Sequence, residues 1–197
     1  MLTLVLLLIF LVVLGLSWFQ GLWNNLLTLI NVLFAAMIAV SFYEPIATAI
    51  ANQEASFTYL YDFLIMWGLF AISLILFRLI SEFASLERVK FIMPIEMAGR
   101  TILAIWLAWI VICFTTMTLH TAPVQSTPFG GAFASSNAGV FLGMAPDRLW
   151  VGFMRSRSTG VFAGSDTFDE GKTWTAKHFH RRKNFEGEEE FRVRASE

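Results

Sequence analysis

The first part of the chain contains four long apolar runs that are separated by short polar breaks. The runs cover residues 2–19, 22–42, 59–80 and 102–119. An α-helix needs about 20 apolar residues to cross the roughly 30 Å hydrocarbon core of a bilayer. Backbone polar groups must be paired inside that core, so each run predicts a membrane-spanning helix. The breaks are short, which predicts that consecutive helices lie antiparallel.

Charged side chains are sparse in this apolar part. The first basic residue is Arg78, and the acidic residues before it are Glu44, Glu54 and Asp62. The whole chain has 197 residues and is 56% hydrophobic and 15% charged, whereas about 25% charged residues is usual for a globular domain. A water-soluble domain could not cover so much apolar surface without charged faces. The sequence therefore predicts an all-α, multi-pass membrane protein with about four transmembrane helices.

The charge distribution divides the chain into an apolar domain over residues 1–120 and a polar tail over 121–197. Residues 121–140 are rich in Pro, Ser, Gly and Ala and are expected to form a linker. Residues 144–155 predict a short amphipathic helix, with Pro and Asp suited to its first turn. Residues 156–197 carry basic and acidic runs and are expected to be mostly irregular.

Polar side chains also occur inside the apolar runs. Asn24, Thr28 and Asn31 recur at helical spacing on one face of the second run, and Asp62 lies near the start of the third. Amides are costly against lipid, so those of the second run are expected to face other helices, where they either form packing contacts or line a polar path through the membrane. Asp62 is interpreted either as an interfacial group that reaches the lipid headgroups or as part of an ion or proton path.

Glu96 and Arg100 precede the fourth run at the spacing that favours an ion pair on a helix. The sequence contains few candidate residues for a metal, cofactor or catalytic site. The chain has one cysteine, Cys113, and His178 and His180 lack further ligands nearby, so no metal or cofactor is expected. There is no phosphate-binding glycine loop and no catalytic set, so an enzyme is not expected. The net charge of −1 argues against a nucleic-acid partner.

The distribution of cations in the links predicts the orientation. Arg78, Arg88, Lys90 and Arg100 flank the break between the third and fourth runs, whereas no Lys or Arg lies between the second and third. Short links rich in Lys and Arg stay in the cytoplasm. Alternation then places the N-terminus and the tail on the outer side. Because the first two runs are marginal in length and their link is uncharged, a re-entrant pair is an alternative to two full spans.

Two short motifs give the layout a family resemblance. Residues 20–25 read Gln-Gly-Leu-Trp-Asn-Asn, and residues 98–100 read Ala-Gly-Arg at the start of the fourth run. With the four short apolar segments, they resemble the CvpA family, the colicin V production proteins of bacterial inner membranes. Gln20 stands where the family usually has Arg, and Asn25 stands where it usually has Glu.

The resemblance implies a non-enzymatic accessory or scaffold role in toxin production, export or envelope maintenance. The expected partners are membrane lipid and either further copies of the chain or other envelope proteins. A small transporter or channel subunit, with a polar path along the second helix, is the alternative function. A membrane anchor that displays the tail outside is the third.

Overall fold

A computed structural model describes residues 1–51, 58–85, 91–122, 124, 140–159 and 168–187. Within these ranges the elements are helices, and no β-strand is formed. They are α1 (Leu2–Trp18), α2 (Leu22–Ala51), α3 (Thr58–Ala84), α4 (Met93–Thr121), α5 (Pro146–Ser158) and α6 (Trp174–Gly187). The expected all-α class is confirmed.

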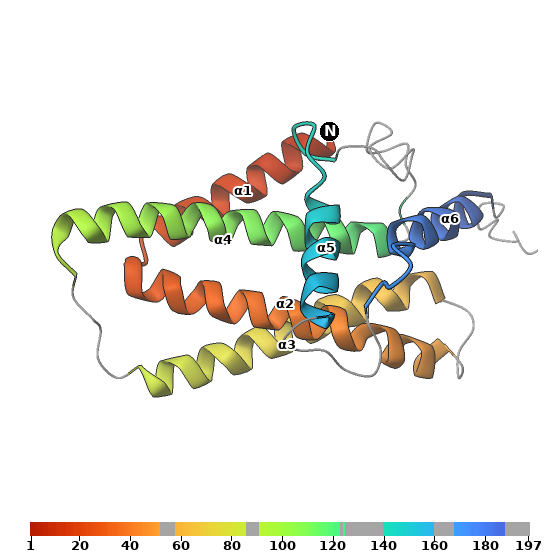
Figure 1. The fold of residues 1–197 in the computed structure, drawn as a ribbon, viewed down its shortest axis with the longest axis horizontal. Coiled ribbons are helices and arrows are strands. Elements are labelled where there is room, and N and C mark those ends of the chain that lie inside the picture. The colour runs from red at the N-terminus through yellow and green to blue at the C-terminus, as the bar shows by residue number, and fades with distance from the viewer. Residues whose placement is uncertain (52–57, 86–90, 123, 125–139, 160–167, 188–197) are drawn as a thin grey trace, which may run out of the picture.

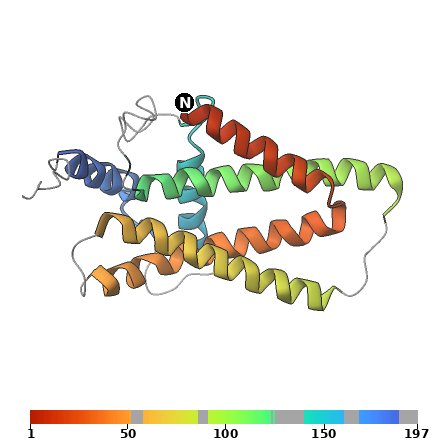
Figure 2. The ribbon, with the colours of Figure 1, turned by 180° about the vertical axis from the view of Figure 1, so that it is seen from behind.

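The long helices α1 to α4 form an elongated bundle, which α5 crosses transversely while α6 lies at one end (Figure 1). α2 packs on α3, and α4 contacts each of the other five helices. The α1–α2 turn, the end of α3 and the start of α4 lie at one end of the bundle. The end of α2, the start of α3 and the end of α4 lie at the other, next to α6 (Figure 2).

Three helices are long and apolar enough to cross a membrane: α2 over Leu22–Ile50, α3 over Leu60–Ala84, and α4 over Met93–Thr121. α1 is a shorter apolar helix of 17 residues, about 26 Å long at the usual rise per residue. Leu4, Leu8 and Leu11 of α1 are exposed, as expected of a helix that faces lipid. The chain is therefore a helical membrane protein whose described residues include three candidate spans and a shorter apolar helix.

α2 continues past the point where the sequence suggested a polar connection. Glu44 and Pro45 lie inside the helix, which runs to Ala51. Proline removes one backbone hydrogen bond and crowds the preceding turn. Here Tyr43 and Ala47 on either side are buried, so packing holds the helix together across the proline.

The tail packs on the bundle. Phe114 of α4 stacks on Phe70 with ring centroids 4.6 Å apart and meets Trp67 of α3 and Trp150 of α5 edge-on. The same buried cluster includes Trp174 of α6. The boundary near residue 120 thus separates two compositions but not two hydrophobic cores.

The tail differs from expectation in one element. α5 forms where the amphipathic helix was expected, but α6 is helical where an irregular chain was expected. Trp174, His178 and Arg182 recur every fourth residue and are all buried, and the Oδ1 of Asp169 accepts the backbone N–H of Trp174 at 2.9 Å. The cap and the buried face explain why a highly charged segment is helical here. Most of the expected linker lies outside the described residues.

Candidate functional site

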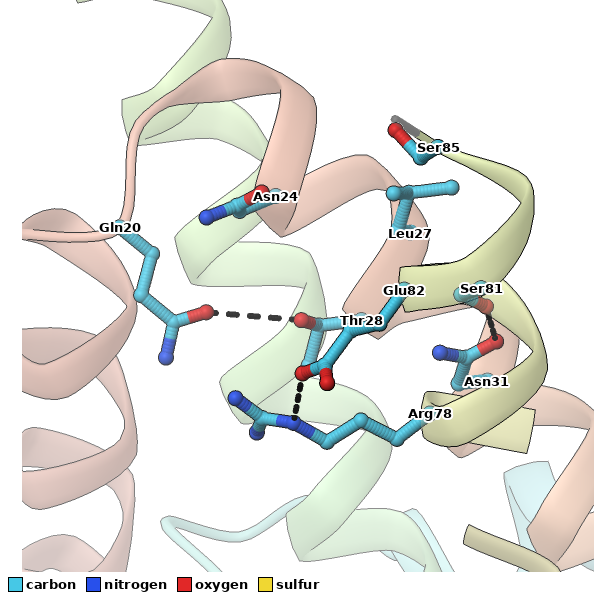
Figure 3. A pocket seen from close by; sticks show the side chains of 9 residues that line it. All are labelled: Gln20, Asn24, Leu27, Thr28, Asn31, Arg78, Ser81, Glu82 and Ser85. Atoms are coloured by element: carbon cyan, nitrogen blue, oxygen red, sulfur yellow. Dashed lines mark hydrogen bonds and ion pairs between the residues drawn. The ribbon is translucent and has the colours of Figure 1, made fainter. Parts of the chain in front are cut away.

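A polar cavity of about 520 Å³ lies where the α1–α2 turn meets the last turns of α3. Its lining comes from that turn, the first part of α2 and the end of α3 (Figure 3). The lining residues are Gln20, Asn24, Leu27, Thr28, Asn31, Arg78, Ser81, Glu82 and Ser85. The three α2 residues predicted to share a polar stripe therefore lie together on this cavity.

Helical spacing places these groups. Asn24, Thr28 and Asn31 lie one turn apart along α2, and Ser81 and Ser85 lie one turn apart on α3. The sharp turn before α2 is made by Gly21 at φ +81°, a conformation that glycine adopts without strain. The turn holds Gln20 beside the start of α2, so one cavity receives side chains from separate parts of the chain.

Hydrogen bonds connect the lining across helices. The Ser81 hydroxyl donates to Asn31 Oδ1 at 2.9 Å, and the Trp23 indole donates to Ser85 Oγ at 2.7 Å. Thr28 Oγ1 donates to Gln20 Oε1 at a longer 3.4 Å. Asn31 thus joins α2 to α3, as the packing interpretation predicts. Asn24 and Thr28, on the same face of α2, also line the cavity.

Asp62 does not belong to this cavity. It lies near the start of α3, at the other end of the bundle, where it forms an ion pair with Arg181 of α6. Beyond Asn31, the same face of α2 continues as Ala35 and Ala39, which are fully buried. The stripe along α2 therefore becomes apolar before it approaches the level of Asp62.

The expected ion pair between Glu96 and Arg100 is not formed in the described part of the chain. The Arg100 guanidinium lies instead over the Trp18 ring, 5.0 Å from its centroid. A cation over an aromatic face is attracted by the ring quadrupole, and Trp18 of α1 offers that face next to α4. The contact fixes the end of α1 against the start of α4.

The two motifs that carry the family resemblance meet in space at this end of the bundle. The Asn25 side-chain amide donates to the backbone oxygen of Arg100 at 3.4 Å. A Cβ added to Gly99 would lie 2.7 Å from Leu22 Cδ1. Gly99 therefore allows the α1–α2 turn to approach α4 closely.

A polar cluster at the opposite end of the bundle was not predicted from the sequence. Trp174 Nε1 donates to Tyr43 Oη at 3.0 Å, and Lys177 Nζ lies 2.7 Å from Glu44 Oε1. The four-residue spacing of Trp174, His178 and Arg182 could have predicted the buried face of α6 from the sequence. The partners of these residues could not be predicted, because they depend on how the tail folds back onto the bundle.

α5 and α6 also bring buried titratable groups to this end. His120 Nε2 and Asp147 Oδ2 lie 2.9 Å apart, joining the end of α4 to the start of α5. Burial lowers the pKa of His178 to about 4, and the neighbouring positive charges act in the same direction. His178 is therefore neutral at pH 7 and serves as a packing group.

Among the described residues, no group of three or more His, Cys, Asp or Glu side chains is placed to hold a metal ion. No family model matches the chain, and no curated protein or solved structure matches it. The apolar helices, the cavity and the folded tail are therefore the features that indicate a function.

Proposed function

We propose that this protein is a non-enzymatic accessory or scaffold protein of the bacterial inner membrane. Following the resemblance to the CvpA family, it serves toxin production, export or envelope maintenance. The observation that carries the proposal is the separation of its polar ends. The cavity of Asn31 and the ionic cluster of Asp62 lie at opposite ends of the bundle, and buried Ala35 and Ala39 occupy the face of α2 beyond Asn31. Each end offers a surface for partners.

The contact between the two resemblance motifs supports the proposed relation to the CvpA family. Gly99 accommodates Leu22, and the Arg100 backbone accepts a hydrogen bond from Asn25. Motifs that were recognised separately in the sequence therefore form one contact in the fold. A shared contact of this kind gives a physical reason for their joint occurrence.

The proposed orientation places the cavity end in the cytoplasm. Arg78 and Arg100 lie at that end, and further cations occur in the link between α3 and α4. α6 then lies at the outer end, and α5 crosses the bundle transversely (Figure 1). The partners would be envelope proteins or further copies of the chain, with lipid around α1 and α3.

Topology mapping and native electrophoresis test the proposal together. Reporters fused at Gln53, Lys90 and Glu197 should report the outside, the cytoplasm and the outside, respectively. Blue-native electrophoresis of gently solubilised membranes should show the protein in an assembly. A strict monomer without partners would contradict the scaffold role, and an external Lys90 would reverse the orientation.

The cavity itself favours the alternative, a small transporter subunit, because its polar side chains belong partly to the candidate spans α2 and α3, and polar groups on spanning helices often mark a solute path. Proteoliposomes that contain the purified chain decide between the two. A scaffold should give no ion or solute flux above empty liposomes. Flux that Asn31→Leu or Asp62→Asn abolishes would establish the transporter and remove the scaffold.

A further inference from the structure

The polar cavity is set in a surface that lipid solvates. Leu16 of α1 and Leu79 of α3 lie close in sequence to lining residues, and both are exposed. A polar hollow at the end of apolar helices lies at the depth of lipid headgroups, provided that the helices insert as their composition indicates. An amphiphile in the membrane can therefore reach the cavity from the side.

The surface next to the cavity changes from polar to apolar within one turn of α2. Phe34, one turn beyond Asn31 and beside the face that buried Ala35 continues, is exposed and tilts against Phe77 with ring centroids 6.2 Å apart. Ile30, also exposed, flanks the same strip. Polar groups at the end of the bundle and apolar groups toward its middle match a molecule with a polar head and a hydrocarbon chain.

The charges on the cavity are arranged as a pair. Arg78 Nε and Glu82 Oε1 lie 3.0 Å apart, and the two side chains are 67% and 63% exposed. Figure 3 shows the two charged ends side by side, with Thr28 next to them. Arg78 uses Nε for Glu82, which leaves its terminal nitrogens able to donate to a phosphate. Glu82 can accept from a primary ammonium.

We propose that this cavity binds the headgroup of a phosphoethanolamine lipid. Arg78 holds the phosphate, Glu82 accepts the N–H groups of the ammonium, and the hydroxyl and amide groups of Ser85 and Asn24 bind the remaining polar atoms. The acyl chains lie along Ile30 and Phe34. The proposal needs the membrane insertion of α1, α2 and α3, and it does not depend on the accessory role.

Native mass spectrometry of the delipidated full chain in detergent tests this site. The wild type should retain phosphatidylethanolamine about tenfold better than phosphatidylcholine, whose quaternary ammonium cannot donate, because a charged hydrogen bond is worth roughly that factor. It should also prefer phosphatidylethanolamine to phosphatidylglycerol. Arg78→Gln should weaken retention of phosphatidylethanolamine and phosphatidylglycerol. Glu82→Gln should remove the preference for phosphatidylethanolamine over phosphatidylglycerol, because it removes the negative charge beside the phosphate site.

Matched controls separate the site from general charge effects. Glu44→Gln and Arg157→Gln alter exposed charges outside the cavity and should leave lipid selectivity unchanged. Both cavity charges are exposed, so their substitution should preserve the fold, which thermal unfolding in detergent checks. If the controls change selectivity as much as the cavity variants do, the site is disproved.

Other results would also overturn the proposal. Equal retention of all three lipids by the wild type would show nonspecific binding. Displacement of the lipid by soluble phosphoethanolamine at equal concentration would indicate a water-soluble ligand instead. Efficient disulfide dimerisation of Gln20→Cys in a Cys113→Ala background would show that a second copy covers the cavity.

Discussion

The indole of Trp174 in α6 donates a hydrogen bond to the hydroxyl of Tyr43 in α2, with 3.0 Å between Nε1 and Oη. The two residues are far apart in sequence, and both side chains are buried. The contact joins the last described helix to the second one. The contact shows that the polar tail is packed on the apolar bundle at the end opposite the cavity.

This bond predicts the behaviour of two conservative variants. Trp174→Phe and Tyr43→Phe should each lower the free energy of unfolding by about 1–3 kcal/mol, because each leaves one buried polar group without its partner. The double variant should lose less than the sum, since both groups are removed together. Thermal unfolding in detergent measures all three. Strict additivity would show that the bond contributes nothing of its own.

The buried His178 predicts a pH dependence of α6 docking. Its pKa is lowered to about 4, compared with about 6.5 in an undocked helix. The undocked state binds more protons between these values, so docking is fully stable above about pH 6.5 and weakens as the pH falls toward 4. Each pKa unit corresponds to about 1.4 kcal/mol.

Hydrogen exchange in α6 at pH 7 and pH 5, corrected for intrinsic exchange rates, measures this effect. His120, Lys177 and Arg181 contribute to the electrostatic environment of the imidazole, and His120 is also paired with Asp147. The non-titrating His178→Phe variant separates their contributions. It should lose most of the difference in protection between the two pH values, and an unchanged difference would assign the effect to the other groups.

A larger residue in place of Gly99 is predicted to cause a steric clash at the cavity end of the bundle. A Cβ there would lie 2.7 Å from Leu22 Cδ1, so Gly99→Val should destabilise the contact between the α1–α2 turn and α4 by about 1–3 kcal/mol. Leu22→Ala in the same chain should restore part of the loss. Gly68→Ala is the control, because nothing lies within 4 Å of a Cβ there. Thermal unfolding that shows equal losses for Gly68→Ala and Gly99→Val would remove the steric explanation.

Substitution of Phe114 is predicted to have the strongest effect on the stability of the core. It is 1% exposed and contacts aromatic rings from α3 and α5. Phe114→Ala should cost about 3–5 kcal/mol, because it removes those contacts and leaves a cavity. Phe83→Ala removes an exposed ring of α3 and should cost much less. Unfolding midpoints in the same detergent compare the two, and equal shifts would show that the buried cluster does not stabilise the bundle.

Part of the cavity lining could be predicted from the sequence. Asn24, Thr28 and Asn31 were assigned to one helical face by spacing alone, and they line one cavity. Asp62 was grouped with them because it too is a polar group in an apolar run. Its partner, Arg181, comes from a helix formed much later in the chain, and no local pattern specifies such a pairing.

The sequence by itself determined the environment of this protein. Long apolar runs with few charges require helices in lipid, because backbone groups must be paired within each segment. Tertiary structure decided that α6 forms, that Trp174 reaches Tyr43, and that Arg100 lies on Trp18 rather than pairing with Glu96. These features depend on groups that become neighbours only when distant segments pack, whereas hydrophobic length is already a property of each segment alone.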